Sequence, residues 1–513
     1  MLRRILVVMS RVRAPELPQN YPWLNTDKPL SLRELKGRIV ILDFWTYCCI
    51  NCLHILPDLK YLEQKYKDKL TVIGVHSAKF DNEKETENIR QAILRYDIEH
   101  PVLVDSGFQV WQQYAVKAWP TIMVIDPQTY VVASFAGEGN RDVLDELISK
   151  LIQQHQEKGT INPQELNITL EKQRHPSVTP LAFPGKVLAT SKGLFVADSG
   201  HHRIVMSTFE GEVLHLIGTG ESGLKDGSFS KAHFFAPQGM AFDEENQILY
   251  VADTENHAIR RVDLQRQTVE TIAGTGKQSR NTNPHIGAAL ETAINSPWDL
   301  VKIADKLYIA MAGSHQIWEM DLTSNILKTY AGTGAEACID GSLSESIFAQ
   351  PSGITTDGNE LYVADSEGST IRGVGLIFPK FGEPIVRTIF GSGELFGFGD
   401  SDGQGSEVKL QHCLGVEYAN KFLWVADTYN HKIKLVSPIV GNCQTILGDG
   451  SLGLQDGQGK NTRFSEPSGL SIFGSQMFIA DTNNHAIRCV DLKKMEVTTL
   501  KFNALCSPNF CIP

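Results

Sequence analysis

The phrase LFVADSGHHRIV, which begins at Leu194, decides the fold of most of this 513-residue chain, because it returns five more times in nearly the same form. The later copies are LYVADTENHAIRRV from Leu249, LYIAMAGSHQIWEM from Leu307, LYVADSEGSTIRGV from Leu361, LWVADTYNHKIKLV from Leu423 and MFIADTNNHAIRCV from Met477. Repetition at a long, regular period indicates an array of equal structural units. The residues before about 181 do not repeat, so we expect them to form a unit of their own.

Each repeat has the same internal order. A Pro- and Gly-containing turn such as APQGMAF at Ala236 opens it, three strand-like segments follow, and a Gly-rich loop such as IAGTG closes it. The alternation of apolar and polar residues predicts four short antiparallel strands in each repeat. One such sheet cannot bury both of its faces, whereas six sheets packed around an axis can. We therefore predict a six-bladed β-propeller over residues 181–503, followed by a short tail over 504–513.

An acidic residue recurs in the repeats, and a histidine usually follows it four residues later. The acidic position is occupied by Asp198, Asp253, Met311, Asp365, Asp427 and Asp481. A metal-binding or catalytic pair is one interpretation. We favour a structural brace, because the pair recurs in almost every unit and is incomplete in the two units that carry Met311 and Ser369. In such a turn, Asp accepts backbone N–H groups and His or Asn closes the loop.

Charge is distributed unevenly along the chain. The whole sequence has 48 Lys and Arg against 59 Asp and Glu, and residues 1–180 carry 22 of each, so the repeats hold the entire net charge of −11. An acidic repeat region repels a phosphate backbone, so we expect no nucleic-acid partner. The sequence contains no run of eighteen apolar residues, so we also expect no membrane-spanning helix. The short apolar start, MLRRILVVMS, is not typical of a secretory signal, and we expect a cytoplasmic protein.

The region from 14 to 156 alternates predicted strands and helices. Apolar strands are expected at 38–45, 70–77 and 100–105, with a strand pair formed by WPTIMVID and YVVASFAG. Helices are expected at 52–67, 82–96, 107–115 and 140–156. This order predicts a central sheet covered on both faces. A polar segment over 157–180, which contains Pro163 and Pro176, is the predicted linker, and we expect it to pack partly against both domains.

A cysteine pair lies between the first long strand and the first helix. Cys49-Ile50-Asn51-Cys52 is a C-x-x-C motif, and its spacing allows the two sulfurs to form a disulfide. The N-terminus of a helix favours a thiolate on the first cysteine. A metal site would require a second such motif or paired histidines, so we expect a redox pair and no metal or cofactor. The nine cysteines otherwise show no framework of structural disulfides.

The motif and its surroundings resemble thioredoxin-like proteins. In FWTYCCINC, Phe44 and Trp45 match the aromatic pair that precedes the family's motif, and Asp43 matches its buried acid. Ala118-Trp119-Pro120-Thr121 matches the loop whose proline is cis and faces the dithiol. The resemblance implies that Cys49 attacks, Cys52 resolves, Asp43 accepts the proton of Cys52, and Pro120 and Thr121 hold the substrate backbone. Trp45, Trp119 and Thr121 are thus supporting residues.

Two features depart from the thioredoxin pattern. Ile50-Asn51 replaces the family's Gly-Pro, so the redox potential does not follow from the resemblance. Cys48 stands where the family has Trp, and it adds a third thiol, for which a packing role and a chemical role both remain open.

The repeats resemble NHL repeats, and the whole chain resembles the NHL-repeat-containing protein 2 family, in which a thioredoxin-like domain precedes a six-bladed NHL propeller. The resemblance implies a multidomain protein, α/β at first and all-β afterwards. The implied function is a thiol–disulfide oxidoreductase acting on a protein or peptide disulfide, with the propeller binding a protein partner or substrate. The alternative is a non-enzymatic interaction scaffold whose thioredoxin-like domain is structural. The longer members of the family carry a further C-terminal β domain, which we do not expect in this chain.

Overall fold

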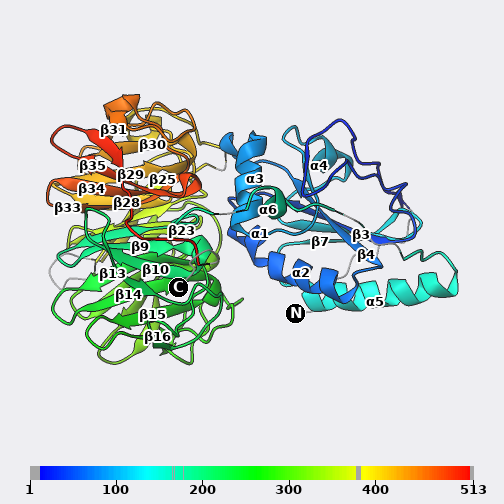
Figure 1. Ribbon diagram of the computed structural model, residues 1–513, viewed down its shortest axis with the longest axis horizontal. Helices are drawn as coiled ribbons and strands as arrows, with labels where there is room; N and C mark the ends of the chain where they lie inside the picture. Colours follow the sequence, from blue (N-terminus) through cyan, green and yellow to red (C-terminus); the bar gives the residue numbers. More distant parts are fainter. Residues whose placement is uncertain are drawn as a thin grey trace. The chain divides into compact units, whose positions relative to one another are not determined.

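The structure is a computed structural model that describes residues 12–163, 166, 168–176, 178–376, 383–394 and 396–508. The chain divides into two compact units, Met1–Pro176 and Ser177–Pro513. The first is a thioredoxin-like α/β unit and the second is a six-bladed β-propeller, as the sequence predicts (Figure 1). Among the described residues, no helix is both long and apolar enough to cross a membrane.

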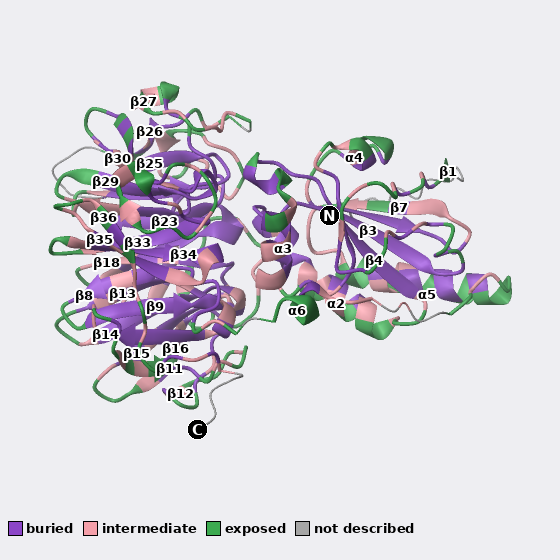
Figure 2. Ribbon diagram, turned by 45° about the horizontal axis from the view of Figure 1, so that its top comes forward, coloured by how far each residue is buried: buried purple, intermediate pink, exposed green. Residues whose placement is uncertain are grey.

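The first unit is built on one mixed sheet. Its seven strands lie in the order β1 (Val12–Arg13), β7 (Tyr130–Ala136), β6 (Thr121–Ile125), β3 (Ile39–Trp45), β4 (Leu70–His76), β5 (Val102–Val104) and β2 (Trp23–Leu24). The apolar strands β3 and β4 run parallel at the centre and are buried throughout, as Figure 2 shows. Strands that are buried on both faces require covering layers on both sides.

The helices of this unit are α1 (Ile50–His54), α2 (Leu56–Lys65), α3 (Thr86–Arg95), α4 (Gln109–Gln113), α5 (Arg141–Glu157), α6 (Glu171–Arg174) and the 3₁₀ turn η1 (Asn82–Lys84). Leu59 and Leu62 of α2 and Leu144 and Ile148 of α5 pack on one sheet face, with Ile39, Ile41 and Val72. The opposite face, which includes Val40, Leu42 and Phe44, packs against Val110 of α4 and leucines of the N-terminal segment.

The helix expected over 52–67 is two helices that meet at Ile55. Pro57 lies in the first turn of α2. Proline has no N–H with which to continue the hydrogen-bond ladder of α1, so one helix ends and another begins. Part of the expected linker folds with the first unit: in α6, Glu171 is buried, accepts the guanidinium of Arg90 at 2.8 Å and receives the N–H of Asn25.

The second unit consists of six sheets, one for each repeat. The first four-stranded set is β8 (Val187–Thr190), β9 (Gly193–Asp198), β10 (Arg203–Ser207) and β11 (Val213–Ile217); the second is β13 (Pro237–Asp243), β14 (Ile248–Asp253), β15 (Ala258–Asp263) and β16 (Thr268–Ala273); the third is β18 (Pro297–Ile303), β19 (Lys306–Met311), β20 (Gln316–Asp321) and β21 (Ile326–Ala331). The fourth is β23 (Pro351–Thr356), β24 (Glu360–Asp365), β25 (Thr370–Gly375) and β26 (Ile385–Phe390); the fifth is β28 (Gly415–Ala419), β29 (Phe422–Asp427), β30 (Lys432–Val436) and β31 (Asn442–Leu447); the sixth is β33 (Pro467–Phe473), β34 (Gln476–Asp481), β35 (Ala486–Asp491) and β36 (Glu496–Thr499).

Five of the six blades have a fifth strand that the sequence pattern did not predict. These short strands are β12 (Gly227–Ser228), β17 (Ile286–Ala288), β22 (Gly341–Ser342), β27 (Gly403–Gln404) and β32 (Gly457–Gln458). Each comes from the loop before its blade and pairs with that blade's outermost strand. Two or three residues are too short to produce a recognisable alternation, which is why the sequence pattern misses them.

The recurring aspartate is a structural brace, as expected. Oδ1 of Asp253 accepts the N–H of Phe235 at 2.8 Å, and its Oδ2 accepts Arg260 at 2.7 Å. The recurring histidine acts differently from the expected loop closure, because it joins neighbouring blades. Nδ1 of His257 accepts the N–H of Ser296 in the next blade at 3.0 Å. Equivalent bonds are made by His202, His315, His431 and His485, and by the Ser369 hydroxyl in the fourth blade.

The ring closes between the sixth and first blades. The innermost strand β8 contacts both β13 and β33, and His485 accepts the N–H of Phe183 at 3.1 Å. The segment after β36 then lies along the first blade, where the N–H of Asn503 donates to the carbonyl of Gly211 at 2.9 Å. Cys506, in the same segment, is disulfide-bonded, which corrects the expectation that the chain has no structural bridge.

Candidate active site

The dithiol lies at the carboxyl end of a central strand. β3 ends at Trp45, and Cys49 is the residue at which α1 begins. The carbonyl of Cys49 accepts the N–H groups of Cys52 at 3.0 Å and Leu53 at 3.2 Å. This first helical turn brings the two cysteines together, and burial together with the neighbouring Cys49 raises the pKa of Cys52. Both are free thiols; 9% of Cys49 is exposed, whereas Cys52 is fully buried.

The loop with Pro120 lies at the same end of the sheet. β6 runs antiparallel to β3 with Thr121 opposite Phe44, so the residue before Thr121 stands beside the end of β3. The Trp119–Pro120 peptide bond is cis. Nε1 of Trp119 donates to the carbonyl of Ser77 at 3.0 Å, and the Thr121 hydroxyl donates to the carbonyl of Ala118 at 2.7 Å. The fold thus brings Pro120, Trp119 and Thr121 to the strand end that carries the dithiol.

Asp43 lies on the sheet face that α2 covers. It is fully buried, and it shares this face with Trp45, Ile39 and Ile41 because side chains alternate along a strand. Burial raises the pKa of Asp43 to about 7, although the charge of His100 opposes this rise. Burial also raises the pKa of Cys52 well above its ordinary value, and Cys49 and Asp43 add to that effect. A carboxyl group that titrates near neutral pH suits the acceptance and return of a proton.

A buried glutamate that the sequence analysis did not identify holds the loop before the motif. Glu83 accepts the N–H of Cys48 at 2.9 Å with one oxygen, and those of Lys79 and Phe80 at 3.0 and 2.9 Å with the other. Cys48 itself is 3% exposed, and its Sγ lies 3.8 Å from the Thr46 hydroxyl. Glu83 stands in the polar stretch DNEKETEN, where nothing in the sequence distinguishes it from a surface residue.

Two histidines near the site were also missed. His76 lies opposite Trp45 in the β3–β4 register, and its ring is stacked on Tyr47 with centroids 5.5 Å apart. Burial lowers the pKa of His76 to about 3, so it is neutral. His100 is 3% exposed, and its Nδ1 lies 3.5 Å from a carboxylate oxygen of Glu63 on α2. The sequence alone does not indicate that these two histidines lie near the site, because their place depends on how the parallel strands pair.

Both units are similar in sequence to known proteins. The thioredoxin-like family matches residues 37–131. The human protein named NHL repeat-containing protein 2 is 42% identical over 525 residues, which cover 95% of this chain and 71% of that protein. The chain belongs to the NHL repeat-containing protein 2 family.

Other members and relatives differ in length. "Protein SUPPRESSOR OF QUENCHING 1, chloroplastic" from Arabidopsis thaliana is 44% identical over 517 residues, 96% of this chain, which spans about half (48%) of that protein. The thiol-disulfide oxidoreductase ResA from Bacillus cereus is 30% identical over 124 residues, 24% of this chain and 69% of that protein. The first unit therefore has relatives that are named as thiol–disulfide oxidoreductases.

The described residues contain no cluster of three His, Cys, Asp or Glu side chains arranged to hold a metal ion.

Proposed function

We propose that this protein is a thiol–disulfide oxidoreductase that uses Cys49 and Cys52, and that its propeller binds the protein partner or substrate. The observation that carries the proposal is the pair of free thiols in the first turn of α1, close to a buried acid whose pKa is raised to about 7. An unreactive structural pair needs no such acid, since an ionisable group in the interior costs stability.

The reaction follows from the different burial of the two sulfurs. The Cys49 thiolate attacks one sulfur of a substrate disulfide, the substrate S–S bond breaks, and the first substrate sulfur leaves as a thiolate. Cys52 then gives its proton to Asp43, and its thiolate attacks the Cys49 sulfur of the mixed disulfide. The second substrate sulfur leaves, so that the substrate disulfide is reduced while the protein dithiol is oxidised. Pro120 and Thr121 hold the substrate backbone during both steps.

The role of the propeller rests on its architecture and charge. Repeat folds present loops on a rigid frame, which suits protein recognition. The excess negative charge of the repeats favours a partner with a basic or neutral surface over a nucleic acid. The cytoplasmic location stays a prediction.

The test is disulfide reduction by the full chain. We expect the wild type to reduce insulin in the presence of a dithiol donor, and we expect Cys49→Ser to abolish the reaction. Cys52→Ser should accumulate a mixed disulfide with the substrate, which mass spectrometry identifies. Cys489→Ser is the matched control, because it removes a partly buried thiol from the propeller. Equal, negligible reduction by the wild type and Cys49→Ser would favour the non-enzymatic scaffold.

A further inference from the structure

Below the dithiol, several buried polar atoms on one sheet face lack hydrogen-bond partners. Among the described residues, none is bonded to either carboxylate oxygen of Asp43, to Nε1 of Trp45, to either ring nitrogen of His76 or to Nε2 of His100. Buried polar groups are nearly always paired with protein or with ordered water. Their concentration in one place is a costly arrangement for a domain core, and it points to a role in chemistry.

The strand register explains how these atoms come together. Asp43 lies opposite Gly74, and Trp45 lies opposite His76. A Cβ atom on residue 74 would stand 2.9 Å from Nε1 of Trp45 and 3.3 Å from Nε2 of His100. Because Gly74 has no Cβ atom, Nε1 of Trp45 and Nε2 of His100 can both approach its backbone, beside Asp43. Two nitrogens and a carboxylate are sufficient partners for one bound water molecule.

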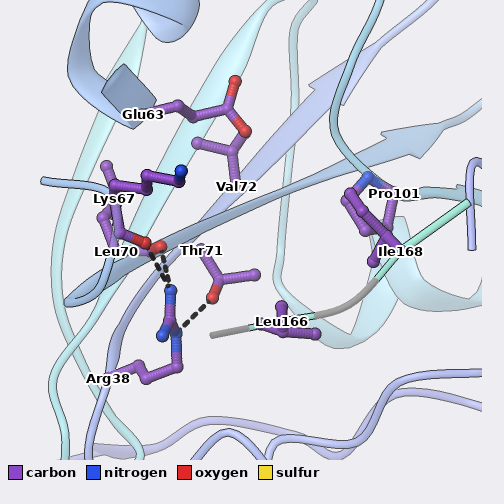
Figure 3. A pocket seen from close by; sticks show the side chains of 9 residues that line it. All are labelled: Arg38, Glu63, Lys67, Leu70, Thr71, Val72, Pro101, Leu166 and Ile168. Carbon is purple, nitrogen blue, oxygen red and sulfur yellow. Dashed lines mark hydrogen bonds between the residues drawn. The ribbon is translucent and has the colours of Figure 1, made fainter. Parts of the chain in front are cut away.

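From His100, the polar path continues to the surface. Nδ1 of His100 lies 3.5 Å from Oε2 of Glu63, and 26% of the Glu63 side chain is exposed. Glu63 lines a cavity of about 310 Å³ with Lys67, Val72 and Pro101, and Figure 3 shows its carboxylate beside Val72. Leu166 and Ile168 line the same cavity. The path thus begins at the fully buried Asp43 and ends at a solvent-accessible carboxylate on α2.

The charges along this path are matched for proton transfer. Burial alone lowers the pKa of His100, but Glu63 and Asp43 raise it above the ordinary histidine value, with a smaller contribution from Glu99. Glu99 is itself paired with Lys60 and Lys172, at 3.3 and 2.5 Å. The other titratable groups that face Asp43 are the neutral His76 and the thiols of Cys49 and Cys52. Asp43 has a pKa raised to about 7, and the neighbouring carboxylates raise the pKa of His100, so His100 is able to take up a proton that Asp43 releases.

We propose that Asp43, His100 and Glu63 form a proton outlet, which carries the proton of Cys52 to solvent at the cavity beside α2, over a water molecule held by Asp43, Trp45 and His100. The outlet rests on the proposed thiol–disulfide exchange. Asp43 takes the proton when Cys52 becomes a thiolate. Nε2 of His100 then receives a proton over the water while Nδ1 gives one to Glu63, which releases it to solvent. Trp45 and His100 act here as positioning and relay residues, and the electrons move only between the sulfurs.

The test compares proton release with thiolate release in a single turnover of the reduced full chain. The probe is a bis(nitrobenzoate) disulfide, because both of its sulfurs leave as coloured thiolates and all protons therefore enter the buffer, where a pH dye detects them. The variants are His100→Gln and Glu63→Gln. Asp58→Asn is the matched control, since it removes a carboxylate from the same helix α2 on the side that faces Arg141, 3.8 Å away.

In the wild type and Asp58→Asn, we expect the second proton to appear together with the second thiolate. In His100→Gln and Glu63→Gln, the second thiolate should still form, but its proton should reach the buffer about tenfold later or more. Protons and thiolates that appear together in both variants would overturn the outlet while leaving the exchange reaction intact. A wild type that releases no second thiolate would overturn the exchange reaction, and the outlet with it. The two variants change one buried and one partly exposed residue, so a folding defect in one of them still leaves the other to decide the test.

Discussion

At the residue scale, the proposed chemistry depends on the buried carboxyl group of Asp43. It follows the apolar residues Ile39 and Ile41 on the same face of β3. Burial raises its pKa to about 7 from an ordinary value of 3.8. Ionisation of Asp43 therefore opposes folding. A buried acid that is kept at such a cost in folding free energy is typical of a functional site.

The first prediction concerns Asp43→Asn. Since the folded pKa is raised, the unfolded chain loses its proton first, and the wild type loses stability as pH rises from about 4 to 7. The loss is complete above pH 7 and amounts to roughly 4 kcal/mol. Asp43→Asn removes this loss, so we expect the variant to be more stable than the wild type at pH 8 and to have slower disulfide reduction. Urea unfolding at pH 4.5 and 8, with hydrogen exchange read on β3, measures the difference. Parallel pH profiles for the two proteins would contradict this account.

At the scale of the element, each blade is held by one turn that the repeated phrase encodes. Where it is present, the aspartate fixes the turn within its blade, and the side chain four residues later joins the blade to its neighbour by accepting a backbone N–H group. Ser369 makes the same link at 3.1 Å that His431 makes at 3.1 Å, so an acceptor at this position matters more than an imidazole ring. A neutral histidine is required for this bond, because a protonated ring has no free acceptor.

The second prediction follows from His431. Burial lowers its pKa below the ordinary 6.5. A depressed histidine pKa contributes stability that is present above pH 6.5 and is lost as pH falls below it, by up to about 1.4 kcal/mol per pH unit. We expect His431→Ser to keep the link, as Ser369 does, and to reduce the acid destabilisation of the fifth and sixth blades. Hydrogen exchange of these blades at pH 5 and 7 measures the effect. His233→Ser, at a partly exposed histidine outside the interblade links, is the control, and an equal reduction there would refute the link.

At the scale of the whole propeller, one side chain joins blades across the axis. Lys186 precedes β8 in the first blade, and its Nζ contacts Asp299 of the third blade at 3.2 Å and the carbonyl of Ser352 of the fourth at 3.0 Å. It also donates to the carbonyl of Leu414. Two acids share this interior: burial raises the pKa of Asp299 and raises that of Glu417 to about 8. Lys186 is thus the cation that balances them.

The third prediction is that Lys186→Met destabilises the propeller by about 3–5 kcal/mol, because Asp299 is left buried without its partner. The double variant Lys186→Met/Asp299→Asn should recover part of this loss, since it removes the charge left without a partner. Urea unfolding of the full chain, with hydrogen exchange read on β8, β18 and β23, measures both. A double variant as unstable as the single one would show that Lys186 acts through packing alone.

Periodicity in the sequence determined the architecture of this protein. Six copies of one phrase specified six sheets, and the alternation of apolar strands with helices specified the first unit, because local patterns of period two and 3.6 report directly which faces are buried. The motif CINC was recognisable from its place between a strand and a helix, whereas Asp43 and Trp119-Pro120 were recognisable only through the resemblance to thioredoxin-like proteins. Only the tertiary structure decided the rest. His100, Glu63, Glu83 and Lys186 act on residues far away in the chain, and such contacts depend on strand register and ring closure, which no local pattern records.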